Sequence, residues 1–437
     1  MEDTPRSETV STKLHAIAEQ AVRYPDTVFT TLMHNIDVEF LFEAFRRTRK
    51  DAAPGVDGVT AEEYAGNLGE NLRSLHARMR SGGYKAPPVK RVWLDKEGGK
   101  KRPIGMPAFE DKIVQRAVTM LLESVYEQDF HDFSYGFRPG RSAHQAIGAL
   151  RERCMELNTR WIVDADISGF FDNLDHGHLR DILRLRVNDG GVLRFVGKWL
   201  NAGVLEGQEL THPETGSPQG GVISPLLSNI YLHHVLDDWF VKEVQPRLQG
   251  RSFLIRYADD FVVGCEYESD ARRVLAVLPR RFGRYGLNIH PEKTQLVKFG
   301  KPGSKGSPKS GNGTFDFLGF THYWATSRRG YWVIKRRTMR SRLKRAMKAL
   351  WQWCRENMHR PIMEQHKTLC QKLRGHYQYY GLRTNGTMLQ KLYSHARYAW
   401  RHWLSRRNRK HNITWEMFEK LMAKFPLPAS RTIHKNI

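Results

Sequence analysis

Cysteine pairs, long apolar runs and an apolar leader segment are all missing from this sequence of 437 residues, and each absence excludes a class of protein. The 4 cysteines form no Cys-x-x-Cys pair, which argues against a zinc module or a disulfide framework and favours a reducing, cytoplasmic setting. No stretch approaches about 18 consecutive apolar residues, so we expect no transmembrane helix. The first 20 residues begin with acidic side chains and contain no apolar segment, unlike a secretory signal peptide.

Acidic residues are scarce in the last quarter of the chain. Residues 331–437 contain 25 Lys and Arg but only 4 Asp and Glu. Residues 1–330 contain 45 Lys and Arg and 42 Asp and Glu. The net charge of +24 therefore lies almost entirely at the C-terminal end. Such a block indicates a polyanionic partner, because each phosphate that is neutralised releases counterions. A hydrophobic fraction of 40% excludes a mostly disordered basic tail.

Apolar spacing predicts a mixed core of helices and strands followed by an all-helical end, which is an α+β fold. The expected helices lie at 34–47, 62–80 and 111–126, after Arg141, from Lys335 to about residue 410, and at 414–424. The expected strands lie at 159–167 and 252–265, within 286–300 and 314–324, and in a hairpin at 89–107 with a basic tip. A Gly/Ser/Lys-rich stretch at 300–313 predicts a mobile loop.

Two groups of carboxylates each accompany a predicted strand. Asp259 and Asp260 lie between two apolar runs, while Asp164 and Asp166 share one strand face, with Asp172 following. A hairpin turn would explain the first pair, although the turn lacks the Gly or Asn of most tight hairpins. Clustered carboxylates are costly unless a cation neutralises them, and all-oxygen ligands suit Mg²⁺. Together with the basic block, the pattern indicates a nucleic-acid polymerase that uses two Mg²⁺ ions.

The segment Tyr257-Ala258-Asp259-Asp260 resembles the YxDD signature of reverse transcriptases. Other motifs occur in the expected order: GVDGVT (55–60), KEGGKKRPIGMP (96–107), SYGFRPGRSAHQAI (134–147), WIVDADISGFFDNLDH (161–176), GSPQGGVISPLLSNIYL (216–232), GLNIHPEKT (286–294) and FDFLGF (315–320). The series is similar to that of group II intron-encoded reverse transcriptase/maturases. The resemblance implies a right-hand polymerase with fingers and palm, followed by a C-terminal all-helical thumb/maturase domain.

The resemblance assigns the catalytic and metal-binding roles to three carboxylates. Asp166 matches the first catalytic aspartate, and Asp259 and Asp260 match the pair in YxDD, so these three are expected to hold two Mg²⁺ ions. Asp164 and Asp172 match no catalytic position and are expected to make local hydrogen bonds or turns. No side chain is an obvious general base, because phosphoryl transfer depends mainly on positioning and electrostatics. The implied reaction is attack of a primer 3′-OH on the α-phosphate of a dNTP, with loss of pyrophosphate.

Further positions match the family's nucleotide-binding parts. Phe171 aligns with the steric gate that favours dNTPs over rNTPs, whereas Phe170 is expected to be an ordinary core residue. Lys96 and Arg102 match the family's fingers hairpin. Gln219 and Gly220 match the loop that lies against the nucleotide and the template. Glycine suits a position where backbone must approach a ligand closely.

Basic and aromatic residues alternate over 335–410, which predicts an RNA-binding surface rather than a merely solvated helix. The candidates are Arg340, Lys344, Lys348, Arg374, Arg397, Arg401, Arg406 and Arg407. The segment LRGHYQYYGL (373–382) resembles the core of the thumb/maturase domain. Its Tyr377 and Tyr380 are expected either to pack in the core, which we favour, or to stack on bases.

The sequence thus predicts an N-terminal extension (1–80), fingers and palm (81–330), a helical thumb/maturase domain (331–410) and a short tail (411–437). The resemblance implies an RNA-directed DNA polymerase, in the bacterial cytosol or nucleoid, that binds its parent intron RNA for splicing and retrohoming. Its implied partners are structured intron RNA, an RNA template with a DNA primer, dNTPs and a DNA target; the protein would be a monomer or homodimer. Because only about 27 residues follow the basic helices and no cysteine pair occurs, we expect no HNH endonuclease and a primer from elsewhere.

Two other functions remain open at this stage. The chain could be a free-standing, domesticated reverse transcriptase used in repair or defence, without an intron partner. It could also be a splicing cofactor with a vestigial polymerase, although the complete aspartate set argues against that alternative.

Overall fold

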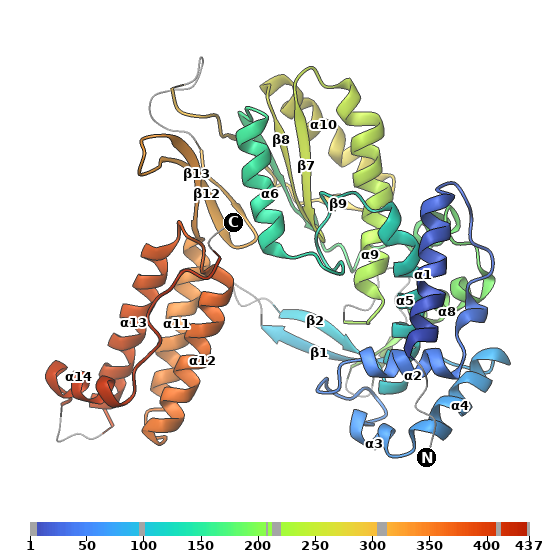
Figure 1. Ribbon diagram of the computed structural model, residues 1–437, viewed down its shortest axis with the longest axis horizontal. Helices are drawn as coiled ribbons and strands as arrows, with labels where there is room; N and C mark the ends of the chain where they lie inside the picture. Colours follow the sequence, from blue (N-terminus) through green and yellow to red (C-terminus); the bar gives the residue numbers. More distant parts are fainter. Residues whose placement is uncertain are drawn as a thin grey trace.

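The computed structural model describes residues 7–95, 101–206, 209–211, 220–303, 313–407 and 412–434 (Figure 1). Within these ranges the fold is a mixed α/β body followed by a helical C-terminal part, which confirms the predicted α+β class. No helix in the described ranges is long and apolar enough to cross a membrane.

The N-terminal helices pack onto a long central helix. They are α1 (Ser7–Arg23), α2 (Val38–Arg47), α3 (Ala61–Ala65) and α4 (Leu68–Arg80), and the central helix is α5 (Phe109–Asp129). Two predicted boundaries were wrong. The helix expected at 34–47 begins at Val38, because the Asp37 side chain accepts a hydrogen bond from the amide of Phe40 and caps the helix there. The helix expected at 62–80 is two helices, since the chain leaves α3 at Gly66.

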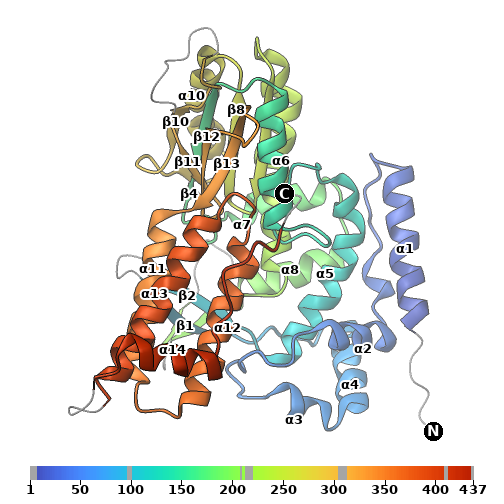
Figure 2. The ribbon, with the colours of Figure 1, turned by 60° about the vertical axis from the view of Figure 1, so that its left-hand side comes forward.

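The two strands of the hairpin predicted at 89–107 are present as β1 (Val89–Asp95) and β2 (Lys101–Met106), paired antiparallel. Residues 96–100, where the basic tip is expected, lie outside the described residues. A four-stranded sheet of order β2-β1-β5-β6 is completed by β5 (Val204–Glu206) and β6 (Glu209–Thr211). Helices α7 (His176–Arg184) and α8 (Gly190–Leu200) precede β5. Figures 1 and 2 show this hairpin extending from the N-terminal helices towards the C-terminal ones.

A second four-stranded sheet carries the sequence motifs. Its order is β10-β3-β8-β7, from β3 (Trp161–Ala165), β7 (Ser252–Tyr257), β8 (Asp260–Cys265) and β10 (Gln295–Lys298). Side chains alternate between its two faces: Ile162 packs beneath α6 (Ala143–Glu156), whereas Val163 joins the core beneath α10 (Glu268–Gly283). Beside it, β4 (Ile167–Ser168) pairs with β9 (Asn288–Ile289).

A helix with an unusual winding lies against this sheet. It begins as α9 (Ser224–Leu232) and continues through two π-helical turns, η3 (His233–Asp238) and η4 (Phe240–Val244), to the short 3₁₀ turn η5 (Gln245–Arg247). Single π-helical turns are rare and are found mostly where function needs them.

The C-terminal part begins with a three-stranded sheet of β11 (Phe315–Phe317), β12 (Phe320–Thr326) and β13 (Trp332–Thr338). Within the described residues that follow, the helices are α11 (Arg340–Glu356), α12 (Ile362–Tyr380), α13 (Gly386–Ser405) and α14 (Trp415–Lys424). The predicted helical start at Lys335 was wrong, because Lys335 pairs with Tyr323 as part of β13 and the helix begins at Arg340. Of the loop expected at 300–313, residues 304–312 lie outside the described residues.

Candidate active site

The YxDD segment forms the turn of the β7–β8 hairpin. Tyr257 pairs with Asp260, which leaves Ala258 and Asp259 as the two turn residues. Ala258 adopts the left-handed conformation (φ 56°), which is unfavourable for a residue with a Cβ. Gly136 packs against this turn so closely that a Cβ there would lie 2.1 Å from the Ala258 nitrogen. The turn is therefore held in shape by its neighbours rather than by its own preference.

The strand register places Asp166 beside the YxDD turn. Ala165, the last residue of β3, pairs with Phe261 of β8, so Asp166 follows β3 beside Asp260. Burial raises the pKa of Asp260 to about 7, and the next largest causes are the negative charges of Asp259 and Asp166. Because like charges raise this pKa only at short range, the three carboxylates predicted from the sequence lie together in one electrostatically coupled group.

A fourth carboxylate belongs to the same group. Burial raises the pKa of Asp164 to about 6, and the charges of Asp316 and Asp166 add to the rise, while a 3.2 Å hydrogen bond from Gln295 opposes it. Asp164 thus makes the local hydrogen bond that the sequence predicts, and it also adds negative charge near Asp260.

The donor set fits a hard divalent cation. The charges that raise the pKa of Asp260 belong to Asp259, Asp166 and Asp164, with no cysteine or histidine among them, so carboxylate charge is crowded there. The Lys293 ammonium forms an ion pair with the Asp166 carboxylate, so a cation already occupies one side of the group. Mg²⁺ bound by these oxygens would neutralise the crowded charge.

The two adjacent phenylalanines have different surroundings. Phe170 is 2% exposed and lies in the main core, as predicted, whereas Phe171 is half-buried and packs only against the edge of that core. Their rings meet edge to face with centroids 5.4 Å apart. Asp172 lies in the same turn, where its amide donates to the carbonyl of Gly169 over 2.9 Å.

The predicted nucleotide-binding positions are only partly visible. Lys96 and Gln219 lie outside the described residues, and for Arg102 the backbone alone is described, in β2 opposite Leu94. Gly220 has φ 121°, and a Cβ there would lie 2.3 Å from the carbonyl oxygen of Gly105. Glycine is therefore needed where this loop crosses β2.

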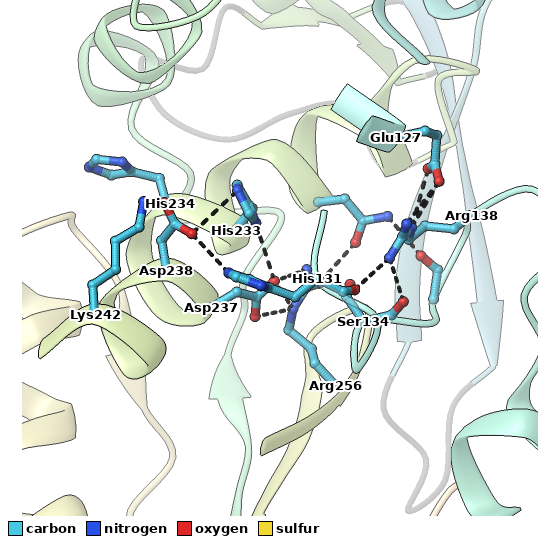
Figure 3. Close-up of polar contacts among 12 residues, drawn as sticks. Glu127, His131, Ser134, Arg138, His233, His234, Asp237, Asp238, Lys242 and Arg256 are labelled. Carbon is cyan, nitrogen blue, oxygen red and sulfur yellow. Dashed lines mark hydrogen bonds and ion pairs between the residues drawn. The ribbon is translucent and has the colours of Figure 1, made fainter. Parts of the chain in front are cut away.

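A buried arginine beneath the YxDD turn was missed by the sequence reasoning. Arg256 is fully buried and donates to the Ala258 carbonyl over 3.0 Å and to Asn229 over 2.9 Å. It also donates to the Asp237 carboxylate over 2.6 Å (Figure 3). Asn229 in turn donates to the Gly136 carbonyl over 2.7 Å. The network joins three of the sequence motifs. The only sequence signal for it was an arginine within an otherwise apolar strand.

A second missed residue supports the loop that begins at Gly220. The Gln115 side chain on α5 accepts hydrogen bonds from the amides of Val222 (2.7 Å) and Ile223 (3.3 Å). Its amide nitrogen donates to buried Asp111 over 2.8 Å. A buried polar side chain with both ends satisfied fixes the backbone that it contacts.

The helical C-terminal part contacts the turn of the FDFLGF motif through Tyr379. Its hydroxyl donates to the Leu318 carbonyl over 2.9 Å, and its ring stacks on Phe320 at 5.8 Å, so it holds the turn of the FDFLGF motif. Burial raises the pKa of Tyr379 to about 12, with smaller contributions from Tyr380, Tyr257 and the charge of Asp260. Tyr377, by contrast, is 1% exposed in the helical core, as favoured from the sequence.

The eight predicted RNA-binding residues fall into two groups. Six are exposed: Arg340, Lys344, Lys348, Arg374, Arg406 and Arg407. The other two hold the helical domain together, since Arg397 pairs with Glu419 and Arg401 lies 4.4 Å above the ring of Trp415 and donates to the Ile413 carbonyl. The structure thus gives Arg397 and Arg401 intramolecular partners on or next to α14.

Comparison with known proteins agrees with this arrangement. The family "Reverse transcriptase (RNA-dependent DNA polymerase)" matches residues 94–322, slightly more than half of the chain. The chain therefore belongs to the reverse transcriptase family. That match includes the fingers hairpin from Leu94 onward, the aspartates and the FDFLGF turn.

Within the family, the relatives include intron-encoded proteins. Protein YkfC of Escherichia coli (strain K12) is 38% identical over 258 residues, covering 52% of this chain and 67% of YkfC. Group II intron-encoded protein LtrA of Lactococcus lactis subsp. cremoris is 34% identical over 241 residues, covering 55% of this chain and 40% of LtrA. Nuclear intron maturase 2, mitochondrial, of Arabidopsis thaliana is 34% identical over 88 residues, 20% of this chain and 12% of that protein. The resemblance to group II intron-encoded reverse transcriptases is confirmed, although the match spans less than half of LtrA.

Proposed function

We propose that the protein synthesises DNA on an RNA template and binds the RNA of a group II intron. The observation that carries the polymerase function is the coupled carboxylate group of Asp166, Asp259 and Asp260, at the turn of β7–β8, in a chain of the reverse transcriptase family. The direct experiment is extension of a primer annealed to an RNA template, with Mg²⁺ present or chelated.

The three aspartates are the residues that would hold Mg²⁺, and we propose two ions. Mg²⁺, when bound, would make the primer 3′-hydroxyl a better nucleophile and offset the charge that develops on the transferred phosphate. Lys293 adds a further positive charge beside Asp166. Arg256 and Gly136 hold the turn that carries Asp259, so positioning needs no movement during the reaction.

We assign the parts of the chain to the hand-shaped division. Residues 81–330 form fingers and palm, 331–410 the thumb, 411–437 a short tail, and 1–80 an N-terminal extension. The extension contributes to the main core: Ile17 and Phe40 belong to the same buried cluster as residues of α5 and α9. Its removal should therefore expose apolar surface of the polymerase itself.

Phe171 is proposed to exclude the ribose 2′-hydroxyl, and Phe171→Val should therefore admit rNTPs. We expect the ratio of kcat/KM for dNTP over rNTP to fall at least about 10-fold, because the variant removes steric repulsion against one substrate only. Phe170→Val is the matched control, since Phe170 lies in the core and its truncation should lower stability by about 1–3 kcal/mol without changing sugar selectivity. Unchanged selectivity in Phe171→Val would remove Phe171 from this role.

The exposed cations of α11 are proposed to bind RNA phosphates. Arg340, Lys344 and Lys348 are exposed on the helix whose opposite face buries Leu343 and Leu350. Their combined replacement by Gln should weaken RNA binding and reduce the slope of log Kd against log salt by about 2–3, at roughly 0.7–0.9 per phosphate. Filter binding over a salt series measures both.

The control removes the same charge elsewhere. Arg272, Arg273 and Arg280 are exposed on α10, which covers the sheet on the face away from α6. Their replacement by Gln should leave the salt slope unchanged. Equal losses of RNA affinity in the two triple variants would show that RNA binding depends on the net charge of the protein rather than on the α11 surface.

The intron partner rests on the resemblance to LtrA and on the basic helical domain. Recovery and sequencing of the RNA that copurifies with the protein should yield an intron RNA; a DNA target would follow from reverse splicing of that RNA. Unrelated RNAs, with no catalytic intron sequence flanking the coding frame, would favour a free-standing reverse transcriptase. Bound intron RNA without polymerase activity would favour a splicing cofactor.

A further inference from the structure

A compact group of ligand-type side chains lies beside Asp237, the carboxylate that pairs with Arg256 (Figure 3). His131, in the loop after α5, contacts Asp238 of the π-helical turn with its Nε2 2.9 Å from Oδ1. His233 Nε2 lies 3.7 Å from the same oxygen. Among the described residues, these three form the one group of histidine, cysteine or carboxylate ligands whose donor atoms all lie within 4.8 Å of one another.

The π winding creates this arrangement. In an α-helix, residues five positions apart point about 140° away from each other. With i→i+5 hydrogen bonding they come round to the same side, so His233 faces both Asp237 and Asp238 in η3. An α-helical turn at this point would separate His233 from Asp238.

The third ligand, His131, is fixed by its own neighbours. Arg138 donates to the His131 carbonyl over 2.7 Å and to the Ser134 carbonyl over 2.8 Å, and Glu127 holds Arg138 at 3.0 Å. The His131 ring stacks on Phe133 with centroids 5.0 Å apart. The site is thus built before any ligand arrives.

One buried nitrogen in this group has no hydrogen bond. His233 Nδ1 is buried and unpartnered, and the nearest carboxylate oxygen, Asp237 Oδ2, lies 3.9 Å away. A buried ring nitrogen left without a partner is costly. A histidine that binds a metal through Nε2 places its other N–H towards a carboxylate, and Asp237 is the carboxylate on that side of His233, 3.9 Å from Nδ1.

We propose that His131, His233 and Asp238 bind a divalent transition-metal ion, of which Zn²⁺ is the best match. Zn²⁺ bonds of about 2.0–2.1 Å in a tetrahedron require donor atoms about 3.3 Å apart, and the two measured separations of 2.9 and 3.7 Å bracket that value. Two imidazoles and one carboxylate exclude Mg²⁺ as the preferred ion. Lys242 donates to the other oxygen of Asp238, at 2.6 Å, so the metal would bind Oδ1 and replace the hydrogen bond that this oxygen shares with His131 Nε2.

The ion would join the loop after α5 to the π-helical turn. The same turn contributes Asp237, which holds Arg256, and Arg256 holds the Ala258 carbonyl in the catalytic turn. The site would therefore stabilise the support of the catalytic turn without contacting substrate. Its existence does not depend on the proposed polymerase function.

The test is titration of the full-length protein with Co²⁺, followed by displacement with Zn²⁺. The Asp166→Asn/Asp259→Asn variant serves as the background, because it weakens cation binding at the catalytic carboxylates. We expect one equivalent of Co²⁺ with the visible absorption of a nitrogen-containing, four- or five-coordinate site, lost on addition of Zn²⁺. Bound Zn²⁺ should also raise the melting temperature.

Matched substitutions decide the location of the ion. His131→Ala, His233→Ala and Asp238→Asn should each weaken Co²⁺ binding at least about 100-fold. His234 lies on the same helix but is hydrogen-bonded to the Tyr285 hydroxyl. The His234→Asn variant should therefore bind Co²⁺ with unchanged affinity. Partly exposed His131 is the variant expected to fold normally, and circular dichroism checks this. Absence of saturable binding, or full binding by folded His131→Ala, would overturn the proposal.

Discussion

Asp259→Asn should reduce the rate of primer extension at least about 1,000-fold while the affinity for RNA stays within about 2-fold. The substitution keeps the size of the side chain but removes a charged metal ligand at the centre of the coupled group. Electrostatic stabilisation of this kind supplies several kcal/mol of transition-state binding. RNA binding is assigned to the exposed cations of the helical domain, which the substitution does not touch. Single-turnover extension and filter binding measure the two quantities.

The control for this prediction is Asp181→Asn on α7, which changes the net charge equally. Asp181 is exposed and pairs with Arg184 at 3.3 Å, away from the catalytic turn. The Asp181→Asn variant should extend primers at the wild-type rate. Substantial primer extension by Asp259→Asn, or a large loss of its RNA affinity, would contradict the proposal that the carboxylate group catalyses extension while the helical domain binds RNA.

Arg256→Met should lower the free energy of unfolding by about 3–5 kcal/mol, because it leaves the fully buried Asp237 carboxylate without its positive partner. It should also reduce extension, since the Ala258 carbonyl loses the donor that holds the catalytic turn. Urea unfolding followed by tryptophan fluorescence gives the change in stability. Extension under conditions where the variant is folded gives the change in rate.

A double variant separates these two effects. Arg256→Met/Asp237→Leu removes both charges and should recover part of the lost stability without restoring extension, because the donor to Ala258 is still missing. Arg251→Met breaks an exposed pair with Glu266 (3.1 Å) and should cost less than about 1 kcal/mol. If the double variant regained wild-type extension, Arg256 would be a stabilising residue only.

The palm strands and their turn could be predicted because the information is local. The runs at 159–167 and 252–265 contain alternating or β-branched residues, and they form β3, β7 and β8 with the YxDD turn between the last two. Ordered motifs then identified which aspartates belong together. Burial, which raises the pKa of Asp260, depends on residues distant in sequence and could not be predicted.

Contacts between distant segments were the parts that sequence reasoning missed. Arg256 meets Asn229 and Asp237, which lie in another element, and Tyr379 of α12 reaches Leu318 across 61 positions. Composition also cannot distinguish a cation that binds RNA from one that binds its own chain. Arg397 is such a case, because its partner Glu419 lies one helix further along.

The strand–helix boundary near residue 335 shows a related difficulty. Lys335 and the three residues after it are basic and polar like the helix that follows, so their composition predicts helix. Pairing with β12 overrides that preference and keeps them in β13, with Arg336 and Thr338 buried. The helix begins only where this pairing ends.

Synthesis of DNA by the wild-type protein on an RNA template tests the central claim most directly. A primer annealed to an RNA template should be extended with dNTPs in the presence of Mg²⁺, and chelation of the metal or replacement of Asp166 by Asn should abolish the product. Absence of extension by the folded wild-type protein, or extension that survives the loss of Asp166, would show that this carboxylate group is not the catalytic centre.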